Sequence, residues 1–225
     1  MLKIFCAPAR YVQGCDATLQ LAQEMQTLGL TGRPLIIVSS SLRAQLEPMW
    51  QESFGNQGVG YDLYQFGGEC STVEIERIKA EASKNRTKVI IGVGGGKPLD
   101  TARAVASDLG LPVVCCPTVA STDAPTSTVS VVYSPDGEFE KYLFAKRNPD
   151  LVLVDTRIIA RAPVRYLIAG MGDALSTWFE ADAASRAYKK NPVGGYSTLA
   201  ALAIAECCYN TLLRDGTAAL ASVRA

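Results

Sequence analysis

What the sequence lacks excludes several chemistries. The 225 residues contain no histidine, which rules out, within them, zinc fingers with histidine ligands, a Ser-His-Asp triad and a histidine general base. The seven cysteines include no Cys-x-x-Cys pair. Cys115-Cys116 and Cys207-Cys208 are adjacent in sequence, and Cα atoms about 3.8 Å apart are too close for an ordinary disulfide. We therefore expect reduced, buried cysteines in a cytoplasmic protein.

The sequence also lacks an excess of one charge and a long apolar run. Lys+Arg and Asp+Glu both number 22, so charge gives no reason to expect a nucleic acid or an anionic membrane as partner. No apolar run approaches the length of a membrane-spanning helix, and the first ten residues have no signal-peptide core. With 48% hydrophobic residues, the chain is predicted to be globular, with a small-molecule partner.

The stretch KVIIGVGGGKPLDT, residues 88–101, is the most informative one. Its apolar first half predicts a buried strand, three glycines predict a turn, and a helix follows. Open backbone amides, the helix N-terminus and Lys97 would together favour a phosphate group. The segment matches neither the G-x-G-x-x-G fingerprint nor the P-loop. A glycine-rich connection that binds nothing therefore stays open as an alternative.

Strand and helix signals alternate through the first two thirds of the chain. Strands are predicted over residues 3–6, 35–38, 61–66, 89–93, 113–116 and 151–154, with a hairpin over 128–133 and 138–144. Among the intervening helices, one is expected to begin at Asp16, one to be shortened or kinked by Pro48, and one to begin with a capping box formed by Ser71 and Glu74. This βαβ pattern predicts a parallel sheet covered by helices on both faces, with ligands beyond the carboxyl ends of the strands.

Beyond Thr156 only helical periodicity remains, over residues 163–169, 173–188 and 197–213. The fold class predicted is α/β, with a Rossmann-like parallel-sheet domain over 1–162 and an all-helical domain over 163–225. The helical part is expected to be incomplete, because its alanine- and leucine-rich faces need a partner.

Three segments carry a resemblance to a known family: Gly92–Thr101, Pro117–Ser127 and Gly170–Glu180. They resemble bacterial glycerol dehydrogenases of the iron-containing (group III) alcohol dehydrogenase superfamily, and the resemblance runs the whole length of the chain. It implies an NAD-dependent oxidation of glycerol to dihydroxyacetone at a zinc ion, between an α/β domain and a helical domain. It also implies a homo-oligomer.

The resemblance assigns roles to individual residues. The cofactor diphosphate and its neighbouring groups would be held by Gly94, Gly95, Gly96, Lys97, Asp100, Thr118 and Ser121, and the nicotinamide side would be lined by Ser127, Val129 and Tyr133. Asp123 would contact the polyol and Asp173 would be a zinc ligand; zinc would lower the pKa of the bound hydroxyl. Local interpretations stay open for both aspartates, as a turn residue before Pro125 and as an N-cap after Gly172.

Two departures from the family pattern are visible. Where the family has an aspartate for the adenosine ribose, this chain has Ser39, with Arg43 nearby, which predicts weaker discrimination between NAD and NADP. Two family histidines that complete the zinc site correspond to positions beyond Ala225. A catalytic zinc normally has about three protein ligands, so we expect poor zinc binding and little turnover. The alternative is an inactive nucleotide-binding remnant. The run Ser121–Pro125 favours glycerol over a phosphorylated substrate.

Overall fold

The computed structural model describes residues 1–224, which divide into two compact units. The sheet unit comprises Pro8–Val119 and Ala124–Ile159. The helical unit comprises Met1–Ala7, Ala120–Asp123 and the described chain from Ala160 onward. The predicted α/β class, with a parallel sheet and a helical C-terminal part, is confirmed.

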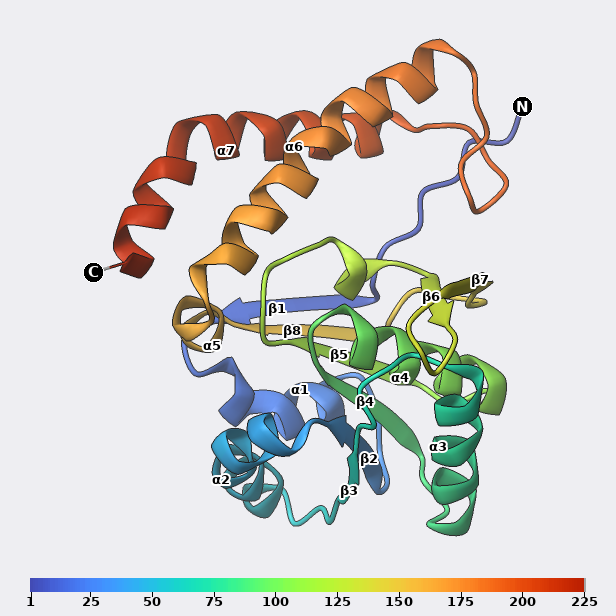
Figure 1. The fold of residues 1–225 in the computed structure, drawn as a ribbon, viewed down its shortest axis with the longest axis vertical. Coiled ribbons are helices and arrows are strands. Elements are labelled where there is room, and N and C mark those ends of the chain that lie inside the picture. The colour runs from blue at the N-terminus through green and yellow to red at the C-terminus, as the bar shows by residue number, and fades with distance from the viewer. Residues whose placement is uncertain (225) are drawn as a thin grey trace. The chain divides into compact units, whose positions relative to one another are not determined.

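In the described chain, the sheet unit contains a six-stranded sheet of order β1-β8-β5-β4-β2-β3, in which every strand is parallel to its neighbours (Figure 1). Its strands are β1 (Arg10–Gly14), β2 (Pro34–Val38), β3 (Asp62–Gln65), β4 (Val89–Gly94), β5 (Val113–Pro117) and β8 (Leu151–Asp155). The predicted hairpin is confirmed as β6 (Val129–Tyr133) and β7 (Phe139–Phe144). All residues of β2 and β4 are buried, as their continuous apolar runs, rich in isoleucine and valine, predict.

Helices cover both faces of this sheet. On one face η1 (Ala17–Gln20), α1 (Leu21–Thr27) and α2 (Ser40–Asn56) pack on a core that includes Ile36 and Ile91. On the other face α3 (Thr72–Lys84) and α4 (Gly96–Leu109) pack on a core that includes Ile37 and Ile90. Neighbouring residues along each strand therefore face opposite helical layers.

The first strand was predicted in the wrong place. Residues 3–6 form only an isolated bridge, from Lys3 to Tyr196, and the strand is β1 instead. β1 pairs with β8 alone at the sheet edge and alternates between half-buried and exposed residues. It therefore has no continuous apolar run by which the sequence could reveal it.

Helix starts follow the sequence signals in part. Ser71 Oγ accepts the Glu74 N–H at 3.3 Å, as in a capping box, but the Glu74 carboxylate accepts from Gly67 instead of closing the box. The predicted cap at Asp16 is wrong, because its side chain makes no capping hydrogen bond. Asp155 takes that role from β8, accepting from the Thr18 amide at 3.0 Å. Pro48 lies inside α2, which continues through it.

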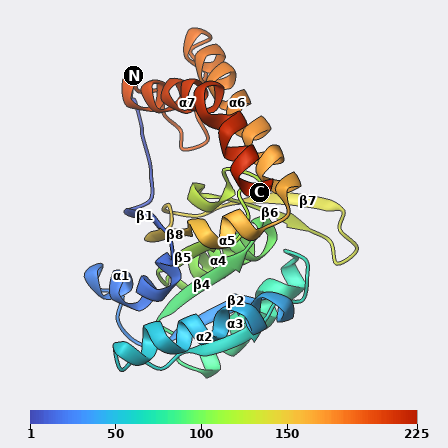
Figure 2. The same ribbon diagram turned by 90° about the vertical axis from the view of Figure 1, so that its left-hand side faces the viewer.

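The helical unit contains α6 (Val164–Arg186) and α7 (Leu199–Arg224), which lie against each other (Figure 2); the short helix α5 (Thr156–Arg161) precedes them. The predicted break at residues 170–172 is wrong, since α6 is continuous. Gly170 serves close packing: a Cβ there would lie 2.0 Å from the carbonyl oxygen of Ala120. Asp173 therefore lies within a helix and is no N-cap. No helix in the described chain is long and apolar enough to cross a membrane.

Candidate nucleotide-binding site

The order in which successive strands are added to the sheet reverses between two neighbouring strands. β2 leads through α2 to β3 on one side, whereas β4 leads through α4 to β5 on the other. β2 and β4 are themselves paired, with Ile37 opposite Gly92. In open α/β sheets, ligands bind beyond the carboxyl ends of the strands at such a reversal. The ends of these two strands, at Val38 and Gly94, therefore mark the candidate site.

The glycine turn lies directly at this point, between β4 and α4. Gly94 has a φ of 145°, and a Cβ there would lie 2.5 Å from Pro98 Cγ. Gly95 is the N-cap of α4, and a Cβ at Gly96 would meet no atom within 4 Å. The Thr118 amide donates to the Gly94 carbonyl at 3.0 Å and fixes the end of β5 beside the turn. The first N–H groups of a helix have no partner within the helix, so an anion could approach them over Gly96.

Lys97 and Tyr133, both predicted cofactor residues, are brought together beside this turn. The Lys97 ammonium lies 5.7 Å from the centroid of the Tyr133 ring. It also forms an ion pair with Glu69, with Nζ 2.5 Å from Oε2. Tyr133 is held in place by its amide, which donates to the Cys70 carbonyl at 2.8 Å. The sequence analysis gave Glu69 no role, and its ion pair with Lys97 is seen only in the structure.

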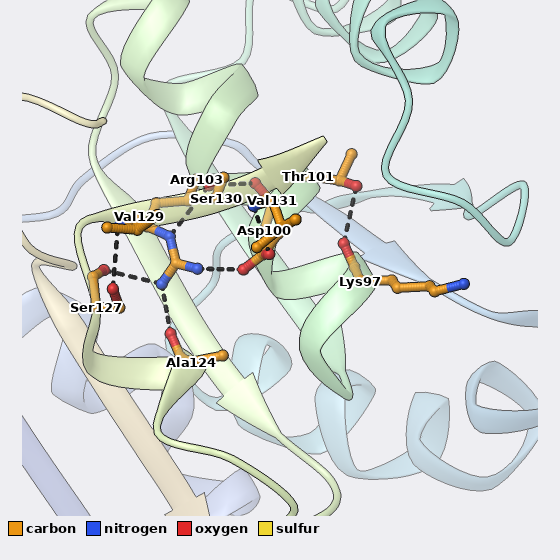
Figure 3. A network of polar contacts seen from close by, with 9 residues as sticks. All are labelled: Lys97, Asp100, Thr101, Arg103, Ala124, Ser127, Val129, Ser130 and Val131. Carbon is orange, nitrogen blue, oxygen red and sulfur yellow. Dashed lines mark hydrogen bonds and ion pairs between the residues drawn. The ribbon is translucent and has the colours of Figure 1, made fainter. Parts of the chain in front are cut away.

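Asp100 lies one turn inside α4 and is buried. Its carboxylate accepts from the Arg103 guanidinium and, at 2.9 Å, from the Val131 amide in β6 (Figure 3). The structure thus places Asp100 where it joins α4 to the hairpin. Its role toward the cofactor stays a prediction.

Ser127 and Val129 belong to the segment that leads into β6. The Ser127 hydroxyl accepts from the Val129 amide at 2.9 Å, and the Ser127 carbonyl accepts from Arg103 Nη1 at 2.9 Å. Arg103, which the sequence reasoning missed, is fully buried. A signal was present, because Arg103 directly follows the core position Ala102 on the inner side of α4. A charged residue so close to the core face is expected to have a specific partner.

The remaining predicted site residues lie in the helical unit. The Asp123 amide donates to Asp173 Oδ2 at 3.0 Å, so the predicted polyol and metal residues are neighbours. Ser121 is on the same short segment, which passes Gly170 closely. In residues 1–224 there is no group of three or more His, Cys, Asp or Glu that could hold a metal ion. The role of Asp173 as a zinc ligand therefore stays a prediction.

The cysteines are free throughout the described chain. Cys70 and Cys115 are buried as predicted, and burial raises the pKa of the Cys70 thiol to about 11 and that of Cys115 to about 12. Both are therefore neutral at physiological pH and serve as small apolar side chains. The prediction of burial is wrong for Cys6, Cys15 and Cys207, which are exposed.

The fold thus defines a doubly wound α/β protein followed by helices. The family model described as "Iron-containing alcohol dehydrogenase" matches residues 8–156, so the chain belongs to this family. It is 45% identical over 98% of its length to a glycerol dehydrogenase from Escherichia coli O6:H1 and 48% identical over 96% to one from Thermotoga maritima. A solved glycerol dehydrogenase from Schizosaccharomyces pombe, 38% identical, superposes over 98% of the chain with a TM-score of 0.92. The chain spans only 56% to 59% of these three proteins.

Proposed function

We propose that this chain supplies the NAD-binding domain and the start of the metal-binding domain of a glycerol dehydrogenase, with the domains at 1–162 and 163–225. The relatives reported above, which are glycerol dehydrogenases, support this proposal. The single observation that carries it is the position of the Gly94–Gly96 turn and Lys97 at the reversal point of the sheet. That place and those groups suit a diphosphate.

In this proposal, residues of the sheet unit hold most of NAD. The diphosphate lies over Gly95 and Gly96, and Lys97 neutralises part of its charge. The nicotinamide ring lies against Val129 and Tyr133, beside the Ser127 hydroxyl. All three of these side chains are partly exposed, as ligand contact requires.

Glycerol is the proposed substrate, and dihydroxyacetone the product. Asp123 would accept a hydrogen bond from one hydroxyl and orient the polyol. Zinc, when bound with further ligands, would lower the pKa of the reacting hydroxyl. Since Asp173 is the only candidate ligand from the predicted set in the described chain, we propose that these 225 residues alone bind zinc poorly and oxidise glycerol slowly or not at all.

The alternative is a nucleotide-binding remnant without catalysis. It is supported by the finding that the described residues contain no group of three or more His, Cys, Asp or Glu that could hold a metal ion. NADH fluorescence, zinc content and glycerol oxidation by the purified chain separate the two. NADH binding without zinc or turnover favours the remnant, whereas bound zinc with turnover favours the enzyme. Failure to bind NADH contradicts both.

The proposal includes a cytoplasmic homo-oligomer. It is supported by the free cysteines and by large apolar side chains left exposed on α6 and α7, among them Phe179, Ile204 and Leu213. Light scattering of the purified chain tests the oligomer, and a monomer at all concentrations would contradict it.

A further inference from the structure

Arg103 is a buried cation in the middle of α4. Its side chain has no solvent exposure, and a buried guanidinium destabilises the fold unless its N–H groups are satisfied. Nη1 donates to the carbonyl oxygens of Ala124 at 2.5 Å and Ser127 at 2.9 Å, and Nε donates to Ser130 Oγ at 3.3 Å. Nη2 donates to Asp100. Figure 3 shows that the guanidinium of Arg103, a residue of α4, contacts all four residues at once.

These contacts join two parts of the sheet unit that are distant in sequence. On one side is α4, whose first turn carries Gly96 and Lys97. On the other is the segment from Ala124 to Val131, which carries Ser127 and Val129. Two further hydrogen bonds from this segment reach Asp100: Ser130 Oγ donates to its carbonyl at 2.9 Å, and the Val131 amide donates to its carboxylate at 2.9 Å.

We infer that Arg103 is a positioning residue that sets the distance between the phosphate turn and the nicotinamide-side segment. The inference rests on the proposed function. Arg103 is fully buried and acts through the Ala124 and Ser127 carbonyls rather than by touching a cofactor. NADH must contact the phosphate turn and the nicotinamide-side segment at the same time, so its affinity depends on the distance between them. A ligand that lacks the nicotinamide and ends at the ribose beyond the diphosphate does not depend on that distance.

The guanidinium is suited to this role by its shape. It presents five N–H donors in a fixed plane and can hold several acceptors in different directions at once. A lysine ammonium at the same position presents three donors from a single point. Arg103→Lys is therefore expected to hold part of the segment, and Arg103→Met none of it.

The test compares two ligands on the full chain. NADH and ADP-ribose affinities are measured for the wild type, Arg103→Met and Arg103→Lys, together with the fluorescence of bound NADH. For Arg103→Met we expect NADH to bind about tenfold more weakly, with a weaker nicotinamide fluorescence change, while ADP-ribose affinity stays within about twofold. Arg103→Lys should be intermediate. Lys84→Met removes an exposed cation from α3 and should leave both affinities unchanged.

Arg103→Met removes the cation that pairs with the buried Asp100 carboxylate, and this loss can prevent folding. Ser130→Ala is therefore the second variant. Ser130→Ala removes one acceptor of Arg103 and should also weaken NADH binding, by a smaller factor. Thermal unfolding identifies the folded variants. If NADH and ADP-ribose affinities fall in parallel in the folded variants, or neither falls, the inference is wrong. If the wild type binds neither ligand, the proposed function itself fails and the inference with it.

Discussion

The Lys97 ammonium lies 2.5 Å from Oε2 of Glu69, although the side chain of Lys97 remains 52% exposed. The cation offered to the proposed diphosphate thus already has a partner. An exposed ion pair contributes only about 0–1 kcal/mol, so a diphosphate, which carries two negative charges, can replace Glu69 as the partner of Lys97. Glu69 therefore weakens the attraction of Lys97 for anions without removing it.

Glu69→Gln should for this reason bind NADH about two- to threefold more tightly, an effect of roughly the size expected for one exposed ion pair. Lys97→Met should bind NADH about tenfold more weakly, and its affinity should depend less on salt. Titrations with NADH at low and high ionic strength measure the affinities of the two variants and their dependence on salt. Tighter binding by Lys97→Met would show that Lys97 does not face the diphosphate.

The glycine turn offers a matched pair of variants. Gly94→Ala places a Cβ 2.5 Å from Pro98 Cγ at a φ of 145°, and should destabilise the fold by about 1–3 kcal/mol. Gly96→Ala meets open space at the start of α4 and should leave stability unchanged or raise it by up to about 1 kcal/mol. Its methyl group, however, should block the approach of the diphosphate. Urea unfolding and NADH titration together separate these effects, and wild-type NADH affinity in Gly96→Ala would contradict the proposed phosphate position.

Two glycines of α6 provide the same comparison in the helical unit. Gly170→Ala places a Cβ 2.0 Å from the Ala120 carbonyl oxygen, so α6 and the Ala120–Asp123 segment must separate. We expect a loss of about 1–3 kcal/mol in the free energy of unfolding of this unit. Gly172→Ala meets no atom within 4 Å and should stabilise α6 by about 0.5–1 kcal/mol. Denaturant titration checks both, and equal effects would refute the close packing at Gly170.

The prediction of weak discrimination between NADH and NADPH rests on Ser39. It is the N-cap of α2 at the end of β2, and nearby Arg43 pairs with Glu47 at 2.9 Å. With no carboxylate at this position to repel a 2′-phosphate, the wild type should discriminate weakly between the two cofactors. Ser39→Asp should restore a preference for NADH, by about tenfold. The ratio of the two dissociation constants measures this, and a strict NADH preference in the wild type would refute it.

Sequence patterns predicted those elements whose signals are local. β2 and β4 are continuous apolar runs, so their burial on both faces of the sheet could be predicted directly from the sequence. β1 and the unbroken α6 depend on contacts between distant parts of the sequence. β1 forms its hydrogen bonds with β8, and residue 170, inside α6, is a glycine because the Ala120 backbone packs closely against it. The resemblance brought Lys97 and Tyr133 into one proposed site, but the ion pair of Lys97 with Glu69 and the backbone acceptors of Arg103 are visible only in the folded geometry.

The most direct test of the central claim is a titration of the ¹⁵N-labelled chain with ADP-ribose, followed through its backbone amide resonances. If the turn between β4 and α4 holds the diphosphate, the amides of Gly95, Gly96 and Lys97 should show the largest, saturable shifts. Saturable shifts confined to other parts of the chain, or no shifts at all, would contradict the account.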